Sequence, residues 1–123
     1  MGDSIAEAST WLKLASATFT TLDDQAGLAQ VLHFWGTLAA QQGRYELAVE
    51  RYRDSLEIRR ELDDKPGIAS LLSILGIVAR FEGDFERAQE LNEESLAIRR
   101  EVGDRWAIAN SLNNQGTIYL DQN

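Results

Sequence analysis

Few residues of this sequence could carry out acid–base or nucleophilic chemistry. It contains a single histidine, His33, and no cysteine. A serine hydroxyl beside His33 would form a nucleophile–base pair, and Ser73, forty positions further along, is the serine we considered. One histidine and no thiolate exclude cysteine-ligated and histidine-rich metal sites. We therefore expect neither a metal ion nor a cofactor.

Adjacent carboxylates are the second group of residues that could take part in chemistry. Asp23 is followed by Asp24, and Asp63 by Asp64. Such pairs could bind a divalent cation or act as general acid and base. Both pairs stand directly before a helical pattern of apolar residues, where a carboxylate accepts a free backbone N–H and complements the helix dipole. We interpret them as helix caps and predict that the chain is not an enzyme.

The sequence repeats itself with a period of forty residues. Residues 23–62 and 63–102 are identical at 17 of 40 positions, which is far more than unrelated segments share. Four residue triplets coincide under this shift: Asp24, Asp64 and Asp104; Gly36, Gly76 and Gly116; Ala29, Ala69 and Ala109; and Leu32, Leu72 and Leu112. Equivalent positions on neighbouring packed helices lie about 10 Å apart, too far for a hydrogen bond between His33 and Ser73.

Each repeat has the pattern of two helices. Apolar residues in 28–39 recur at steps of three and four, which is typical of a helix with one buried face. Gly43 and Gly83 follow these segments and supply tight turns, while Pro66 falls in a first turn, where its missing N–H costs nothing. Second helices are predicted over about 45–62 and 85–102, and Arg-Arg pairs near their ends place cations at the negative end of the dipole.

The residues that alternate along these helices resemble the tetratricopeptide repeat family. The first helix carries a leucine, a bulky residue, a glycine and a small residue at Leu32, Trp35, Gly36 and Ala39, and the second carries small, bulky and small residues at Ala48, Tyr52 and Ser55. The same positions reappear as Leu72, Leu75, Gly76, Ala79, Ala88, Asn92 and Ser95, and in part as Leu112, Gln115, Gly116 and Tyr119. Asn92 and Gln115 depart from the apolar preference. The forty-residue period resembles the longer subclass found in bacterial signalling ATPases and transcription regulators, and in kinesin light chains.

The resemblance implies an all-α fold, a right-handed α-solenoid of antiparallel helix pairs. With A for a first and B for a second helix, we expect five helices in the order B-AB-AB-A. The chain is then one domain, 1–123, made of a half repeat (1–22), two repeats (23–62 and 63–102) and a second half repeat (103–123). This arrangement suggests a piece of a longer array or a chain that completes itself by association.

The resemblance also implies a binding groove lined by the first helices. Carrying the family's groove positions over gives Gln30, His33, Thr37, Ser70, Ser73, Ile77, Arg80, Asn110, Asn113 and Thr117. Many of these are amide or hydroxyl side chains, which both donate and accept hydrogen bonds and therefore suit a peptide backbone. The lysines with which chaperone-binding members hold a terminal carboxylate are absent from these positions, so we do not expect that ligand class.

The two half repeats are predicted to expose complementary faces. Residues expected to mediate self-association are Ile5, Ala8, Trp11, Leu12 and Ala15 near the N-terminus, and Leu112, Gly116 and Tyr119 near the C-terminus. Large apolar side chains left in water usually mark an interface. We therefore expect a homo-oligomer formed through the chain ends.

Composition narrows the function classes further. The net charge is −8, which argues against nucleic acid as a partner, and acidic residues concentrate on the predicted second helices. No apolar run is long enough to span a membrane, and no signal peptide is evident, so we expect a cytoplasmic protein without membrane contact. Our leading hypothesis is a non-catalytic scaffold that binds a protein or peptide in its concave groove, as part of a larger bacterial regulatory protein with a signalling role. The alternative is a self-assembly module.

Overall fold

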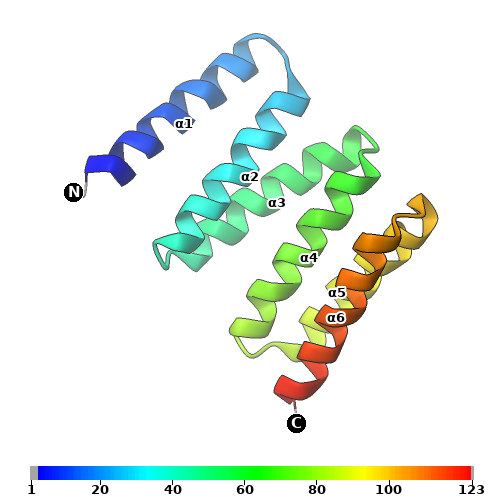
Figure 1. Ribbon diagram of the computed structural model, residues 1–123. Coiled ribbons are helices and arrows are strands. Elements are labelled where there is room, and N and C mark those ends of the chain that lie inside the picture. The colour runs from blue at the N-terminus through cyan, green and yellow to red at the C-terminus, as the bar shows by residue number, and fades with distance from the viewer. Residues whose placement is uncertain (1–2, 123) are drawn as a thin grey trace. The chain divides into compact units, whose positions relative to one another are not determined.

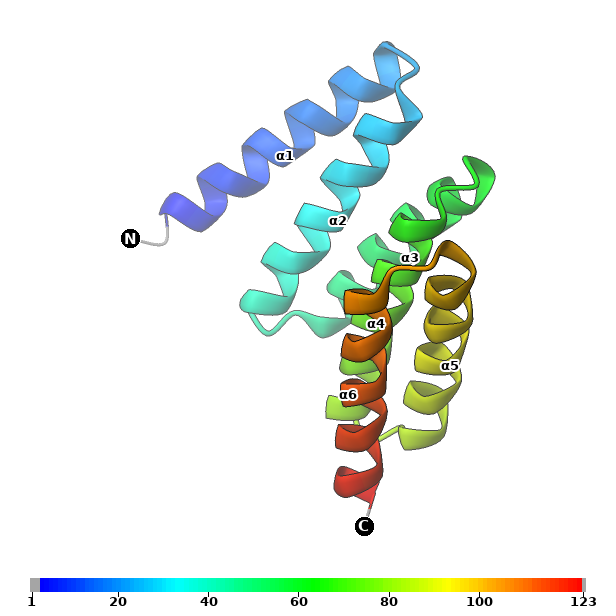
Figure 2. The same cartoon turned by 45° about the vertical axis from the view of Figure 1, so that its right-hand side comes forward.

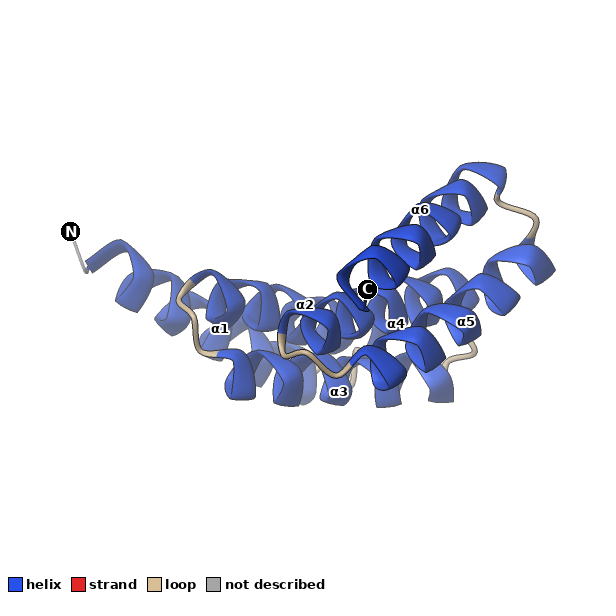
Figure 3. Ribbon diagram, turned by 90° about the horizontal axis from the view of Figure 1, so that it is seen from below, coloured by secondary structure: helices blue, strands red, loops and turns tan. Residues whose placement is uncertain are grey.

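The described part of the chain is entirely helical. A computed structural model describes residues 3–122, and for Asp3 and Ile5 it describes the backbone alone. Within this range there are six helices, connected by short turns (Figures 1 and 3): α1 (Asp3–Thr21), α2 (Gln25–Gln41), α3 (Tyr45–Glu61), α4 (Lys65–Phe81), α5 (Phe85–Val102) and α6 (Arg105–Gln122). The predicted number of five was wrong, because the order B-AB-AB-A contains six elements.

The chain divides into two compact units, residues 1–62 and 63–123. In the first unit, α2 packs against both α1 and α3. In the second unit, α5 packs against both α4 and α6, and α6 also touches α4 (Figure 2). The central helix of the first unit, α2, is the first helix of its repeat. The central helix of the second unit, α5, is the second helix of its repeat.

Aspartates cap the first helices as predicted. The carboxylate of Asp24 accepts the N–H of Gly27 at 2.9 Å, and that of Asp64 accepts the N–H of Gly67 at 3.2 Å. Asp104 repeats the arrangement 40 residues later on the N–H of Ala107. These carboxylates satisfy backbone donors that a first helical turn leaves unpaired, which accounts for their recurrence in the sequence.

The turns between helices require left-handed backbone. Gly43 and Gly83 have φ angles of 75° and 82°, a region that glycine enters at no steric cost, so their prediction as turn residues is confirmed. Asp23 and Asp63 occupy the same region with φ of 55° and 52°. The paired acids therefore divide two tasks: the first residue forms the turn and the second caps the helix.

The two helices of each complete repeat are joined by the same buried hydrogen bond. The hydroxyl of Ser55 on α3 donates to the backbone oxygen of Ala29 on α2 at 2.6 Å, and Ser95 on α5 donates to that of Ala69 on α4 at 2.8 Å. Both serines are fully buried, as are both alanines. Small residues at these positions let the helices approach closely enough for a side-chain hydroxyl to reach a main-chain oxygen.

Candidate binding cleft

In the first repeat, a tyrosine closes the space between the two helices. Tyr52 of α3 is 3% exposed, and its ring lies over Gly36 of α2, where an added Cβ would come within 2.7 Å of it. Its hydroxyl is 3.0 Å from Thr37 Oγ1, and the edge of its ring meets His33 with the ring centres 5.8 Å apart. The predicted groove residues His33 and Thr37 are therefore half-buried against this ring.

The second repeat has Asn92 in place of that tyrosine. Asn92 is 2% exposed, and its Nδ2 donates to Ser111 O at 3.0 Å and to Gln115 Oε1 at 2.9 Å, both on α6. Asn92 and Gln115, the two residues that depart from the family's apolar pattern, are thus hydrogen-bonded to each other. Since a main-chain oxygen can only accept, the amide must present nitrogen to α6, which directs Oδ1 to the opposite side.

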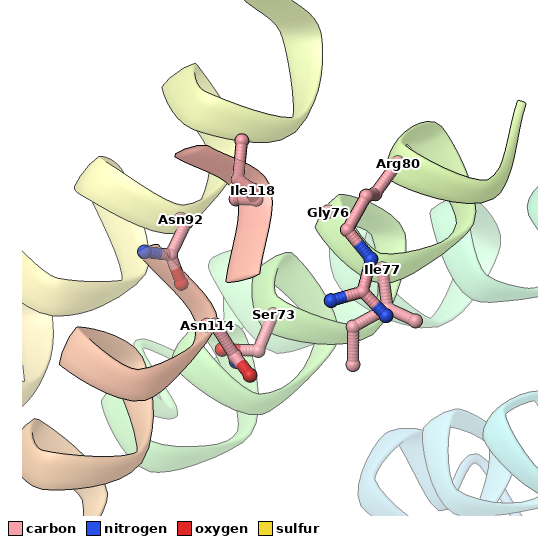
Figure 4. Close-up of a pocket in the computed structure, with 7 residues that line it drawn as sticks. All are labelled: Ser73, Gly76, Ile77, Arg80, Asn92, Asn114 and Ile118. Carbon is pink, nitrogen blue, oxygen red and sulfur yellow. The ribbon is translucent and has the colours of Figure 1, made fainter. Parts of the chain in front are cut away.

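A small cleft lies on that side, between α4, α5 and α6. Its volume is about 10 Å³, close to the minimum that holds one water molecule. Figure 4 shows the residues that line it: Ser73, Gly76, Ile77, Arg80, Asn92, Asn114 and Ile118.

Two polar atoms of the cleft lack hydrogen-bond partners within the described residues. Asn92 Oδ1 is buried without a donor, and Arg80 Nε is buried without an acceptor. Arg80 Nε lies 3.4 Å from Asp121 Oδ2, an ion pair without hydrogen-bond geometry. The guanidinium also lies over the ring of Phe81, 5.0 Å from its centre.

Ser73 adds an acceptor to the cleft wall. Its Oγ lies 2.9 Å from Ser95 Oγ, and Ser95 already donates its single hydroxyl hydrogen to Ala69 O. Ser73 must therefore be the donor of this pair, which leaves the lone pairs of its oxygen available.

The predicted groove residues do not all meet at this cleft. Ser73, Ile77 and Arg80 line it, whereas Asn113 is exposed and does not. Asn114 lines the cleft instead of Asn113. Its spacing of four residues from Asn110 places both on one helix face, and this was the sequence signal that could have identified it.

The remaining predicted groove residues lie elsewhere. Asn110 and Thr117 are half-buried on α6, and the Thr117 hydroxyl donates to Asn113 O of its own helix. Ser70 lines a separate pocket of about 150 Å³ at the start of α4. Gln30 is exposed on α2.

Arg99 and His33 have pKa values below their usual range. Burial lowers the pKa of Arg99, whose Nη1 donates to Ala107 O and to Ser111 Oγ on α6. This arginine, interpreted from the sequence as a helix-terminating cation, also joins α5 to α6. In the first unit, burial and then the nearby Arg59 charge lower the pKa of His33, so its imidazole is neutral at pH 7.

Helix α6 exposes the face that its counterparts bury. Leu72 of α4 is 1% exposed, whereas its equivalent Leu112 is 50% exposed and Tyr119 is 67% exposed. A Cβ added at Gly116 would meet nothing within 4 Å. This face therefore carries the three C-terminal residues predicted to self-associate.

The N-terminal residues predicted to self-associate are on α1. Trp11 is 63% exposed, while Ala8, Leu12 and Ala15 are half-buried. The side chain of Ile5 lies outside the described residues.

The described side chains contain no group of three or more histidine, cysteine, aspartate or glutamate residues placed to hold a metal ion. Among the described helices, none is both long and apolar enough to cross a membrane.

Comparison with known proteins identifies the family. A tetratricopeptide repeat model matches residues 27–101 and 67–123. The chain belongs to the tetratricopeptide repeat family. No curated protein sequence matches it.

Among solved structures, the chain is similar to BtubC (BKLC) from P. vanneervenii, with a TM-score of 0.84 and 22% sequence identity. The match covers 97% of this chain and 50% of that chain, so the present sequence spans about half the length of this relative. At this identity the likeness concerns the fold. Tetratricopeptide repeats generally mediate protein–protein interaction and are typically non-catalytic scaffolds.

Proposed function

We propose that this chain is a non-catalytic scaffold that binds a peptide or protein segment, and that the cleft between α4, α5 and α6 is part of its binding surface. The observation that carries the proposal is the pair of buried, unpartnered polar atoms, Asn92 Oδ1 and Arg80 Nε, at the cleft. Buried polar groups of folded proteins are nearly always paired, so unpaired ones beside a cleft favour a bound partner. Ser73 and Asn114 add further hydrogen-bonding capacity there.

Selection from a random peptide library tests this proposal. Peptides that bind the intact chain should shift the amide resonances of cleft residues, and Arg80→Ala should weaken their binding about tenfold because a charge-assisted contact is lost. Glu90→Ala is the matched control, since Glu90 lies on the exposed side of α5 beside Arg87. Binders that map to α5's exposed side and ignore Arg80 would contradict the proposal.

The wider groove remains part of this proposal. It also includes Gln30, His33 and Thr37 on α2 of the first unit. A place within a larger, cytoplasmic bacterial regulatory protein is proposed with it, on the forty-residue period of the repeats.

Self-assembly is the second candidate, favoured by the exposed face of α6. In α4 the residues equivalent to this face pack against a second helix, α5. Helix α1 of another copy is a second helix by sequence and would supply the missing surface. Burying side chains such as Leu112 and Tyr119 contributes about 1.5–3 kcal/mol each, which favours association.

One residue weakens this pairing and provides its test. Ala15 stands where α3 and α5 carry Ser55 and Ser95, so α1 lacks the hydroxyl that would reach Ala109 O. Light scattering should show concentration-dependent association that Ala15→Ser strengthens and Tyr119→Asp abolishes. A chain that stays monomeric with and without Ala15→Ser would rule the candidate out.

A further inference from the structure

The second unit contains a larger pocket that shares no lining residue with the cleft described above. It has a volume of about 150 Å³ and lies where the start of α4, the end of α5 and the start of α6 meet. Pro66 and Ser70 line it from α4, Arg99 and Val102 from α5, and Trp106 from α6. A cavity of about this volume accommodates a group of the size of benzene.

Arg99 brings a buried positive charge to this pocket. The residue is only 9% exposed, and its Nη1 donates to Ala107 O at 3.2 Å and to Ser111 Oγ at 2.7 Å. Among residues 3–122, its Nε and Nη2 have no hydrogen-bond acceptor, and no carboxylate forms an ion pair with it. A buried charge without a counter-charge is costly, which favours an anion beside it.

The neighbouring serines account for the unpaired Nε. In the first repeat, Arg59 Nε donates to Ser55 Oγ at 3.4 Å. In the second repeat, the equivalent Ser95 Oγ accepts from Ser73 instead, and the guanidinium of Arg99 reaches α6. Neither Nε nor Nη2 of Arg99 is among the fully buried unpaired atoms of the described residues, so both have access to solvent. The pocket that this otherwise buried residue lines provides that access.

The two open nitrogens restrict the polar group of a ligand. Nε and Nη2 of a guanidinium present two parallel N–H groups, the fork on which a carboxylate binds with both of its oxygens. The pocket wall also contains Asp104, whose Oδ1 accepts the N–H of Ala107 at the start of α6. Burial lowers the pKa of Arg99 more than the Asp104 charge raises it, so Asp104 compensates the buried charge only in part.

Apolar side chains at the opening restrict the rest of the ligand. Trp106 is 77% exposed and Val102 is 46% exposed, although both line the pocket, so they lie at its mouth. Pro66 adds a further apolar wall. An aromatic ring bound there covers part of the exposed indole, and such a pair contributes more than the area it buries.

We propose that this pocket binds a small aromatic carboxylic acid, whose carboxylate pairs with Nε and Nη2 of Arg99 and whose ring lies against Trp106. A free acid of about the size of benzoate matches the pocket, because about 150 Å³ encloses a single ring. The proposal does not depend on peptide binding at the cleft, since the two sites have no residue in common.

Titration of the ¹⁵N-labelled full chain with four small probes tests the proposal. Benzoate carries both the ring and the carboxylate; benzamide lacks the charge, benzamidine reverses it, and acetate lacks the ring. We expect benzoate to shift the Arg99 Nε–H and the Trp106 indole N–H saturably, and to bind about fivefold more tightly than each other probe. Benzamide or benzamidine binding as tightly as benzoate would overturn the carboxylate assignment. Acetate binding as tightly would overturn the aromatic one.

Variants locate the binding at this pocket. Trp106→Ala should weaken benzoate binding about threefold, followed through the Arg99 Nε–H and the Ala107 amide. Trp11→Ala is the matched control, because Trp11 is an exposed tryptophan of the first unit, and it should leave benzoate binding unchanged. Arg99→Lys keeps the charge but removes the fork, and should weaken benzoate binding about fivefold.

If Arg99→Lys fails to fold, because the guanidinium also joins α5 to α6, the exposed Trp106 still decides the question. A Trp106→Ala chain that binds benzoate as tightly as the native chain, or an equal loss in Trp11→Ala, would refute the site.

Discussion

The two complete repeats, α2–α3 and α4–α5, share the aspartate caps of their first helices, their glycine turns and their buried serine, but differ at the residue that lies opposite the first-helix glycine across the pair, Tyr52 or Asn92. Tyr52 fills the space above Gly36 and satisfies its hydroxyl within its own repeat through Thr37. Asn92, at the same position, satisfies its amide nitrogen on the next helix, α6, and leaves its oxygen at a cleft. The large residue fills the space within its repeat, whereas the small polar one hydrogen-bonds the next helix and leaves a small cleft.

The largest expected effect comes from giving the first repeat the second repeat's residue. Tyr52→Asn removes a buried ring and leaves a cavity beside Gly36, so the free energy of unfolding should fall by about 3–5 kcal/mol. Urea denaturation followed by circular dichroism measures this loss. Tyr52→Phe is the control, since it loses only the contact with Thr37, worth about 1 kcal/mol. Equal losses in the two variants would show that the ring does not fill the first repeat.

The next largest effect is expected from alanine at the three equivalent glycines, Gly36, Gly76 and Gly116, because the change in stability should differ between the repeats. Gly36→Ala forces Tyr52 to move and should destabilise by about 2 kcal/mol. An added Cβ at Gly76 meets Ala88 O at 3.4 Å and Leu91 Cβ at 3.6 Å, which are tolerable contacts. Gly76→Ala should therefore change stability little, and Gly116→Ala should stabilise by about 0.5–1 kcal/mol through helix propensity. Thermal melts of the three variants in that order provide the test, and a destabilised Gly116→Ala would show that α6's face is covered.

Replacing the two equivalent serines, Ser55 and Ser95, should lower the free energy of unfolding by modestly different amounts. Ser55→Ala should cost about 1 kcal/mol through loss of its bond to Ala29 O, together with the long 3.4 Å bond that Ser55 Oγ accepts from Arg59 Nε. Ser95→Ala should cost more, because it also leaves the buried hydroxyl of Ser73 without its acceptor. The double variant Ser73→Ala, Ser95→Ala should recover part of that difference in the same denaturation assay. A double variant that is less stable than Ser95→Ala would contradict this hydrogen-bond network.

The smallest effect concerns pH and occurs in the first repeat alone, because the second has Ser73 in place of His33. Burial and Arg59 hold the pKa of His33 below its usual 6.5, so unfolding increases proton uptake in acid. The stability contributed by neutral His33 is complete above that usual pKa and is lost as pH falls through the lower value in the folded protein. Unfolding free energies measured at about pH 7.5 and about pH 5 should therefore differ more for the native chain than for His33→Gln. Identical pH dependence in both would indicate that the imidazole is fully hydrated.

Features set by a few adjacent residues were predictable from the sequence. The caps at Asp24, Asp64 and Asp104, and the turn at Gly43, depend on local backbone geometry and were recognised from residue type and spacing. The helix pattern also placed α3 and α5 within a residue of their observed ends.

The cleft could not be predicted in the same way. The sequence marks Asn92 and Gln115 as departures from an apolar pattern, but their partnership depends on helices that only the folded chain brings together. Asn113 and Asn114 are both amides on α6, and which one reaches the cleft is decided by a rotation of about 100° about the helix axis. Sequence spacing alone does not resolve that choice.

The serine bonds between helices also bear on how fast the chain folds. Each joins residues only 26 positions apart, and within each unit the main helix contacts are between neighbours in sequence. Few long loops must close before such contacts form, and helical proteins with this local topology fold in about microseconds to milliseconds. Ser55 and Ser95 can thus secure their own repeats early, whereas the Asn92–Gln115 contact must wait for α6. The cleft is therefore expected to be among the last features of the second unit to form.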